Sequence, residues 1–251
     1  MVHNYEYKFE IRPNKFVFVP TPQTRKNGKK IVREVMQIWT PEDYFYHFGK
    51  RGGHVAAMRP HVGNSFKASL DLTKFFMNVS RAKVVRALKR AGVSSSRSFD
   101  IAFSSCVEFK GRKFIPYGFP QSMLLATMAV ENSALGSQIK TLKASGVYVT
   151  MYVDDIILSH NDKAVLCEAY GELVASANQS GFEVSSKKSS PPSVGVEAFN
   201  CNIDKDISIK HDRMAEFVSQ ICEGTPSTKE AVLRYVDVIN SSQADELNLI
   251  T

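Results

Sequence analysis

Two adjacent carboxylates, Asp154 and Asp155, stand between two apolar segments, and a third, Asp71, closes another apolar segment far upstream. An isolated Asp-Asp pair is most often a turn or a helix cap. Three carboxylates at one place repel one another, so a fold that gathers them usually supplies a cation. Oxygen ligands favour Mg²⁺, with Mn²⁺ as a substitute, and two such ions bind the attacking and leaving oxygens of an in-line phosphoryl transfer. The residues predict nucleotidyl transfer, provided that the fold brings them together.

The order of the apolar segments predicts how the carboxylates meet. We expect a strand at residues 66–72, a helix from Ser80 to Gly92, strands at 147–153 and 156–159, a helix at 162–178 and a strand at 182–184. Apart from an insertion between residues 92 and 146, this order is the split βαβ or ferredoxin-like plan, an α+β fold. The first and third strands are neighbours in that plan, so Asp71 is expected beside the turn that holds Asp154 and Asp155.

Three further segments carry element predictions. Residues 17–20 and 31–35 flank the basic run 25–30 and predict a hairpin over residues 16–35 with cations at its tip. Leucines and other apolar residues at helical spacing predict one long helix from about Ser122 to Lys143. After residue 203, helices are expected at about residues 212–223 and 228–241.

Composition narrows the class of protein. The chain has 251 residues, of which 43% are hydrophobic and 23% charged, which is ordinary for a globular protein. Its apolar stretches are too short to cross a bilayer, and its start lacks a secretory signal, so we expect a cytoplasmic protein with no membrane association. The four cysteines form no C-x-x-C pair and lie in apolar segments, which indicates reduced core thiols.

The net charge of +7 is spread unevenly along the chain. Residues 1–35 hold eight Lys or Arg against three Glu, and residues 81–97 hold six basic side chains and no acid. Such clusters favour a polyanionic partner because each phosphate contact releases condensed counterions. For a single basic run, a solvated helix face is the simpler explanation, so charge alone does not identify the partner.

The surroundings of the carboxylates carry a family resemblance. Residues 152–155 (Tyr-Val-Asp-Asp) resemble the Y-x-D-D box of reverse transcriptases. Residues 71–76 resemble the family's first metal motif, 118–122 its template-handling motif and 181–189 its later Gly-Leu and Lys-Thr motif, while 199–203 lie where its primer-grip hairpin would be. The motifs occur in family order, and the Asp-Leu-x-x-Phe-Phe form is similar to the bacterial enzymes of retrons, group II introns and phage-defence systems.

The resemblance implies a metal site with a general acid. It assigns Asp71, Asp154, Asp155 and the backbone carbonyl of Leu72 to the binding of two Mg²⁺ ions. It makes Lys188, rather than the neighbouring lysine, the group that protonates the pyrophosphate leaving group.

The resemblance also implies nucleotide and primer contacts. Phe76 would lie under the sugar of the incoming dNTP and exclude a 2′-hydroxyl, while Phe75 belongs to the core. Gln121 is expected near the incoming nucleotide and templating base. Tyr152 is expected near the primer terminus, and Ser122, Phe199 and Asn200 also fall in the primer and template motifs. The candidates for gripping the triphosphate are Lys26, Lys30 and Arg33.

The implied architecture is a right-hand polymerase. Fingers would occupy residues 1–65 with the basic hairpin at 16–35, and a ferredoxin-like palm would occupy 66–203 with a fingers insertion at about 92–120. Residues 204–251 would form a short thumb-like helical segment. We expect a protein partner or a homo-oligomer to complete so small a thumb.

The implied function is that of an RNA-directed DNA polymerase, a nucleotidyltransferase that copies RNA into DNA. A dedicated non-coding RNA is one candidate for the template. The setting would be a bacterial antiphage defence or retron-like system. Ser122 departs from the family's Pro-Gln-Gly, and the loss of glycine removes backbone freedom. Two alternatives stay open. One is a template-independent or protein-primed DNA polymerase of the same fold, and the other is an inactive RNA-binding subunit, against which the three retained acids argue.

Overall fold

The computed structural model describes residues 4–13, 15–48 and 53–250, which form two compact units. The first unit comprises Met1–Phe45, Leu72–Thr141 and Glu172–Ser185, and the second comprises Tyr46–Asp71, Leu142–Gly171 and Ser186–Thr251. Each unit therefore gathers segments from three parts of the sequence. Asp71, Asp154, Asp155 and Lys188 all belong to the second unit.

The central sheet confirms the ferredoxin-like order. Its strands β3 (Phe66–Thr73), β6 (Tyr148–Tyr152), β7 (Asp155–His160) and β8 (Glu183–Val184) lie in the order β6-β7-β3-β8. The first and third strands of the predicted plan, β3 and β7, pair antiparallel, as expected. Six successive residues of β3 are buried, so the polar side chains that alternate with its apolar ones, Lys67, Ser69 and Asp71, are buried as well. A further strand, β9 (Ser190–Ser193), also pairs with β3.

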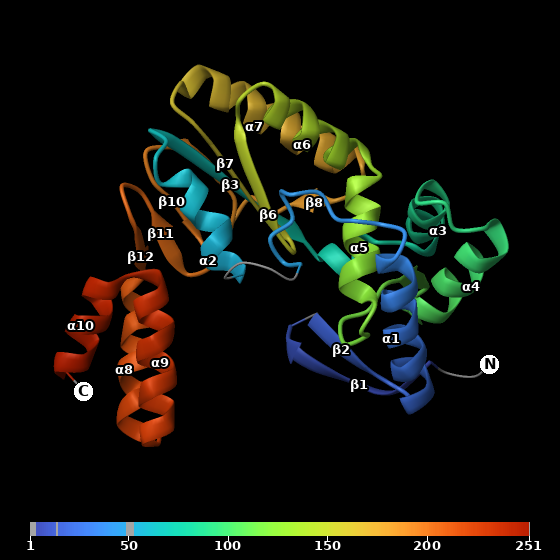
Figure 1. Ribbon diagram of the computed structural model, residues 1–251, viewed down its shortest axis with the longest axis horizontal. Coiled ribbons are helices and arrows are strands. Elements are labelled where there is room, and N and C mark those ends of the chain that lie inside the picture. Colours follow the sequence, from blue (N-terminus) through green and yellow to red (C-terminus); the bar gives the residue numbers. More distant parts are fainter. Residues whose placement is uncertain (1–3, 14, 49–52, 251) are drawn as a thin grey trace. The chain divides into compact units, whose positions relative to one another are not determined.

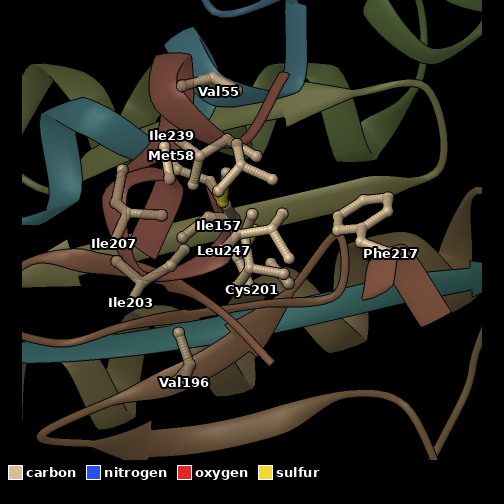
Figure 2. Packing of buried hydrophobic residues seen from close by; sticks show 14 of the residues in the cluster. Val55, Met58, Ile157, Val196, Cys201, Ile203, Ile207, Phe217, Ile239 and Leu247 are labelled. Atoms are coloured by element: carbon tan, nitrogen blue, oxygen red, sulfur yellow. The ribbon is translucent and has the colours of Figure 1, made fainter. Parts of the chain in front are cut away.

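The second unit has one large hydrophobic core. Besides the sheet, this unit contains α2 (Gly53–Met58), the 3₁₀ turn Arg59–His61, and a small antiparallel sheet of β10 (Val196–Ala198), β11 (Cys201–Ile203) and β12 (Ile207–Ile209). Figure 2 shows side chains of α2, β7, this small sheet and the C-terminal helices converging, among them Val55, Met58, Ile157, Ile203 and Ile239. The palm-like strands and the C-terminal helices of this unit thus share a core.

The C-terminal segment forms three helices where the sequence predicts two. They are α8 (His211–Glu223), α9 (Pro226–Ile239) and α10 (Ser241–Ile250), which lie together in Figure 1. The Asn240 side chain accepts a hydrogen bond from the Gln243 N–H at 3.1 Å and so caps α10. The Gln243 amide in turn bonds both the N–H and the C=O of Ile209, at 2.7 and 3.0 Å. These bonds join α10 to the edge strand β12.

The first unit combines a hairpin, helices and a smaller hairpin (Figure 1). The elements are β1 (Tyr5–Arg12), β2 (Lys15–Pro20), α1 (Pro22–Met36), the 3₁₀ helix Phe75–Asn78, α3 (Arg81–Arg90), α4 (Ser95–Ser105), β4 (Val107–Phe109), β5 (Arg112–Phe114) and α5 (Ser122–Glu131). Two more helices, α6 (Ala134–Ala144) and α7 (Lys163–Gln179), have residues in both units. The predicted helix that begins after Ser80 is confirmed, and β4 and β5 pair antiparallel as the smaller hairpin.

The predicted hairpin over residues 16–35 is wrong, because residues 22–36 form α1 and β2 pairs with β1 instead. Thr21 starts the helix by accepting the Thr24 N–H at 3.1 Å, and Pro22 suits the first helical turn. Gly28 belongs to an Asn-Gly pair that suggests a turn. It is helical here, and a Cβ at this position would collide with the Gln121 amide.

The predicted long helix from Ser122 is two helices, α5 and α6, which are separated at Asn132 and Ser133. The Asn132 side chain donates to the Met128 carbonyl at 2.9 Å, and the Ser133 hydroxyl donates to the Val130 carbonyl at 2.6 Å. Local side-chain bonds of this kind satisfy the carbonyls of the last turn and end the helix.

Two composition-based expectations also meet the structure. Cys106 and Cys201 are buried, but Cys167 and Cys222 are exposed, so the prediction of core thiols is wrong for the latter two. Within residues 4–13, 15–48 and 53–250, no helix has the length and apolar character that a membrane span requires.

Candidate active site

The site begins with two carboxylates on neighbouring strands. Asp71 of β3 lies directly opposite Asp155 of β7 in the antiparallel register. Asp155 is the first residue of its strand and pairs with Tyr152 across the β6–β7 hairpin. Asp154 lies in the two-residue turn between these strands. The fold therefore brings the three predicted acids to one end of the β3–β7 ladder.

The turn that carries Asp154 has an unusual backbone. Val153 has φ +61°, a conformation that a β-branched residue rarely adopts. A positive φ at this place matches the twist of a tight hairpin, which explains why the turn uses it. The Val153 N–H donates to Nδ1 of His47 at 3.0 Å, and the adjacent Tyr46 N–H donates to the Met151 carbonyl at 2.9 Å. Residues 46 and 47 thus hold the backbone on both sides of Tyr152.

His47 can accept this bond because its ring is neutral. Burial lowers the pKa of His47 to about 4, although a hydrogen bond to the Met151 backbone opposes the shift. Above that pH, one ring nitrogen keeps the lone pair that accepts from Val153. No spacing or motif in the sequence marks His47, so sequence reasoning missed it.

The electrostatics show an excess of negative charge at the acids. Burial, together with the charges of Asp154 and Asp71, raises the pKa of Asp155 to about 7, while Lys188 opposes the shift. Desolvation disfavours the ionised carboxylate, and the neighbouring acids disfavour it again. Additional positive charge would favour the ionised form.

Lys188 and Ser189 contact Asp71 directly. The Lys188 Nζ lies 3.2 Å from Oδ2 of Asp71, although most of the lysine side chain is exposed. The Asp71 N–H donates to the Ser189 hydroxyl at 3.0 Å. Within residues 4–13, 15–48 and 53–250, Lys187 forms no hydrogen bond or ion pair with these acids. The structure therefore brings together the first metal motif and Lys188, the lysine chosen from the sequence.

Aromatic side chains gather beside the turn. The Tyr152 ring meets those of His47, His54 and Phe199 edge to face, with centroids 5.5–6.1 Å apart. His54 Nε2 lies 3.0 Å from the Tyr235 hydroxyl of α9. Phe199 and Asn200 both have positive φ and form the turn between β10 and β11. The predicted primer residues Tyr152 and Phe199 are thus in contact, and His54 and Tyr235 join them unpredicted.

A second buried histidine lies under the sheet. His61 is fully buried, with ring nitrogens 2.7 Å from the Ser159 hydroxyl and 2.8 Å from the Thr150 hydroxyl. Thr150 donates to the Ala57 carbonyl, so it accepts from the histidine Nε2–H, and Nδ1 accepts from Ser159.

A divalent cation fits the chemistry of these donors. Carboxylates are the ligands that Mg²⁺ and Mn²⁺ prefer, and the raised pKa of Asp155 marks charge that a cation would neutralise. In the present arrangement, no three His, Cys, Asp or Glu side chains of the described residues are grouped closely enough to hold an ion.

Other predicted residues belong to the first unit. Phe76 is buried, and its ring meets that of Tyr117 at 4.5 Å. Phe75 is buried against Phe182, as expected for a core residue. Leu72, whose backbone carbonyl is the predicted extra ligand, directly follows Asp71 in β3.

Gln121 and Ser122 of the template-handling motif are also buried. Gln121 donates to the Ser105 hydroxyl at 3.1 Å and lies beneath Gly28 of α1. Ser122 begins α5, and its hydroxyl donates to the Pro116 carbonyl at 2.7 Å. Because the Ser122 backbone is helical, this position does not need the conformational freedom of glycine.

The predicted triphosphate cations lie on a helix rather than at a hairpin tip. Lys26, Lys30 and Arg33 are exposed on α1 at positions i, i+4 and i+7, which share one face of a helix. They form a cationic stripe along α1.

Comparisons with known proteins agree with the motifs. The family model described as "Reverse transcriptase (RNA-dependent DNA polymerase)" matches residues 8–194. The chain is 22% identical to the retron Ec86 reverse transcriptase of Escherichia coli over 188 residues, which are 74% of this chain and 57% of that protein. It thus spans less than two thirds of this relative.

Solved structures show the same fold. A foamy viral protease-reverse transcriptase in complex with double-stranded DNA matches with a TM-score of 0.50 and 16% identity, over 91% of this chain and 34% of that one. Telomerase from Candida albicans, in complex with a fragment of telomeric RNA, matches with a TM-score of 0.50 and 10% identity, over 89% of this chain and 47% of that one.

Proposed function

The chain belongs to the reverse transcriptase (RNA-dependent DNA polymerase) family, and from this premise we propose that it adds deoxynucleotides to a primer 3′-hydroxyl under the direction of an RNA template. The observation that carries the proposal is the pairing of Asp71 with Asp155 beside Asp154, with Lys188 in contact. The same acids argue against an inactive RNA-binding subunit, because holding them together is costly without a catalytic use.

The three acids would hold the metal ions. Asp71, Asp154 and Asp155, with the Leu72 carbonyl, would bind two Mg²⁺ ions, and Mn²⁺ would substitute. When bound, such ions activate the attacking hydroxyl and neutralise charge on the leaving group. The buried, negatively charged surroundings of Asp155 support this assignment.

The protein's own groups would position and protonate. His47 would hold the turn so that Asp154 keeps its place beside Asp155. Lys188 would protonate the leaving pyrophosphate, since its ammonium already lies beside Asp71. Tyr152 and Phe199 would support the primer terminus through their edge-to-face contact.

Nucleotide selection would fall to the first unit. The Phe76 ring would exclude a 2′-hydroxyl, and its contact with Tyr117 supports the role because it limits movement of the ring. The stripe of Lys26, Lys30 and Arg33 would attract the triphosphate. Gln121 would act near the templating base.

The partners we propose are an RNA template, the DNA product and dNTPs. The similarity to a retron reverse transcriptase supports a dedicated non-coding RNA as the template and a retron-like or antiphage setting in the bacterial cytoplasm. The small C-terminal helical segment supports a protein partner that completes the thumb. Sequencing the nucleic acid that co-purifies with the protein would test the choice of template.

Templated synthesis is tested with a defined RNA and an annealed primer. We expect a product complementary to that RNA, and omission of one dNTP should stop extension at the corresponding template base. Product that forms without RNA, and that continues when single dNTPs are omitted, would refute templating. Asp155→Asn should abolish incorporation whether or not synthesis is templated. Asp162→Asn is the matched control, because the Asp162 side chain caps α7 by accepting the Ala164 N–H.

A further inference from the structure

The N-terminal hairpin presents an open sheet edge. β1 pairs with β2 on one side, and the other side of β2 meets Tyr117, whose carbonyl accepts the Phe18 N–H at 2.9 Å. In the part of the chain that the structure describes, β2 is the one strand that pairs with β1. All seven residues of β1 after Tyr5 are exposed. An open strand of this kind is a template for pairing with another strand.

One face of this edge strand is apolar. Tyr7, Phe9 and Ile11 are 57%, 45% and 49% exposed, and the rings of Tyr7 and Phe9 lie on the same face with their centroids 6.4 Å apart. Soluble proteins usually protect an exposed, apolar edge strand from such pairing. The opposite face carries Lys8, whose Nζ lies 3.9 Å from the centre of the Phe109 ring. The hairpin therefore packs through its Lys8 face and leaves the aromatic stripe outside.

The charges of β1 alternate in sign and complement themselves. Going along the strand, Glu6, Lys8, Glu10 and Arg12 are negative, positive, negative and positive. If β1 meets β1 of a second copy antiparallel with Phe9 opposite Phe9, then Glu6 faces Arg12 and Lys8 faces Glu10. Opposite charges directly across two strands are favourable, and like charges are unfavourable.

Other registers lack this match. A two-fold axis at Lys8 would place that lysine opposite itself, and an axis at Glu10 would do the same for the glutamate. If one β1 strand shifts by one residue relative to the other, charged residues come to lie opposite apolar ones. The apolar face of one strand then no longer matches the apolar face of the other. The register centred on Phe9 pairs all four charges and joins the two apolar stripes.

We propose that β1 pairs with β1 of a second copy of this chain around a two-fold axis at Phe9, giving a four-stranded antiparallel sheet. The contact is isologous, as in most homodimers, because each copy contributes the same strand. The β1–β2 ladder is regular from Tyr7 to Glu10 and irregular at Tyr5–Tyr7 and Glu10–Arg12, so the Lys8–Glu10 pairs would lie in its regular middle and the Glu6–Arg12 pairs at its two ends. This proposal does not depend on the polymerase function.

The charge match is tested by a swap. Sedimentation velocity over a concentration series should show a dimer for the unmodified chain. Glu6→Arg and Arg12→Glu should each weaken the dimer at least tenfold because like charges then meet. The double variant should return to within about threefold of the unmodified chain. Glu108→Arg, on the exposed strand β4, is the matched control and should leave the dimer constant unchanged.

The register is tested by cross-linking in a Cys167→Ser, Cys222→Ser background, which removes the exposed thiols. Phe9→Cys should cross-link rapidly with a short bismaleimide, because position 9 meets itself at the axis. Tyr7→Cys should not, since the two copies of position 7 lie four residues apart along the strands, about 14 Å. A monomer at every concentration, no rescue by the double swap, or faster cross-linking through Tyr7→Cys would each overturn the proposal.

Discussion

The bond between His47 and the turn of Asp154 should be needed for full catalytic rate. His47→Phe keeps an aromatic ring of similar size but removes the nitrogen that accepts the Val153 N–H at 3.0 Å. The N–H then loses its partner at a residue whose φ is +61°. We expect the turn to relax from this conformation, and Asp154 to move with it.

The magnitude follows from the lost bond. An unsatisfied buried donor costs about 1–3 kcal/mol, and a non-glycine residue at positive φ already costs about 1–3 kcal/mol. If the lost bond falls wholly on the catalytic arrangement, the rate should drop about 5- to 150-fold. His47→Gln keeps an acceptor on a flexible side chain and should recover part of this loss.

Single-nucleotide primer extension under steady-state conditions is the assay, with kcat expressed per active site. We expect kcat to fall while the KM for dNTP changes little, because the turn positions a carboxylate rather than the nucleotide. His160→Phe is the matched control, since its Nδ1 accepts the Asp162 N–H at 3.0 Å away from the acids. An unchanged kcat for His47→Phe, or an equal loss for His160→Phe, would refute the role assigned to His47.

Three further predictions concern selectivity, proton transfer and stability. Phe76→Ala should raise the ratio of rNTP to dNTP incorporation. Phe75→Ala, which truncates the buried neighbour, should destabilise the protein without changing that ratio. Equal ratios for both variants would show that Phe76 does not select the sugar. Lys188→Ala should lower kcat by about 10²-fold or more if the lysine is the general acid, while Lys187→Ala should stay near the unmodified rate; similar losses for both would contradict the assignment. Burial lowers the pKa of His61 to about 3, so the unfolded chain binds a proton between pH 6.5 and 3 that the native protein does not. The contribution of His61 to the free energy of unfolding should therefore be largest above pH 6.5 and fall below that pH by up to about 1.4 kcal/mol per pH unit. The raised pKa of Asp155 gives a slope of opposite sign in the same range, so the comparison is between the unmodified chain and His61→Gln, which share that slope. In denaturant titrations the unmodified chain should lose more stability than His61→Gln as the pH falls, and identical losses would show that His61 does not titrate as described.

The sheet and its acids could be predicted because strong local patterns determine them. Alternating apolar residues define β3 and short apolar runs define β6 and β7, and the ferredoxin-like order makes the first and third strands neighbours. Asp71 and Asp155 follow from that order, as their pairing in register confirms. The prediction needed no knowledge of side-chain packing.

Helix α1 and the break between α5 and α6 escaped prediction because the local sequence signals at these two places are weak or conflicting. The Asn-Gly pair at Gly28 suggested a turn, and only the close approach of Gln121 explains a glycine inside α1. The break after α5 depends on bonds from Asn132 and Ser133 to nearby carbonyls, which a count of apolar spacing does not see.

The supporting residues of the site escaped for a different reason. His47, His54 and His61 show no ligand spacing, and their roles arise from contacts with Val153, Tyr235 and the hydroxyls of Thr150 and Ser159. Such contacts exist only after the chain has folded. The domain boundaries predicted at residues 65, 203 and 204 remain predictions.

The most direct test of the central claim is the dependence of RNA-templated dNTP incorporation on Mg²⁺ for the unmodified chain, Asp155→Asn and Asp162→Asn. The account predicts incorporation that saturates with Mg²⁺, that is restored by Mn²⁺ after chelation, and that is lost at every metal concentration in Asp155→Asn but kept in Asp162→Asn. Circular dichroism should show both variants folded. Incorporation by Asp155→Asn at the unmodified rate, or full activity of the unmodified chain in excess chelator, would contradict the assignment of the acids to metal-dependent polymerisation.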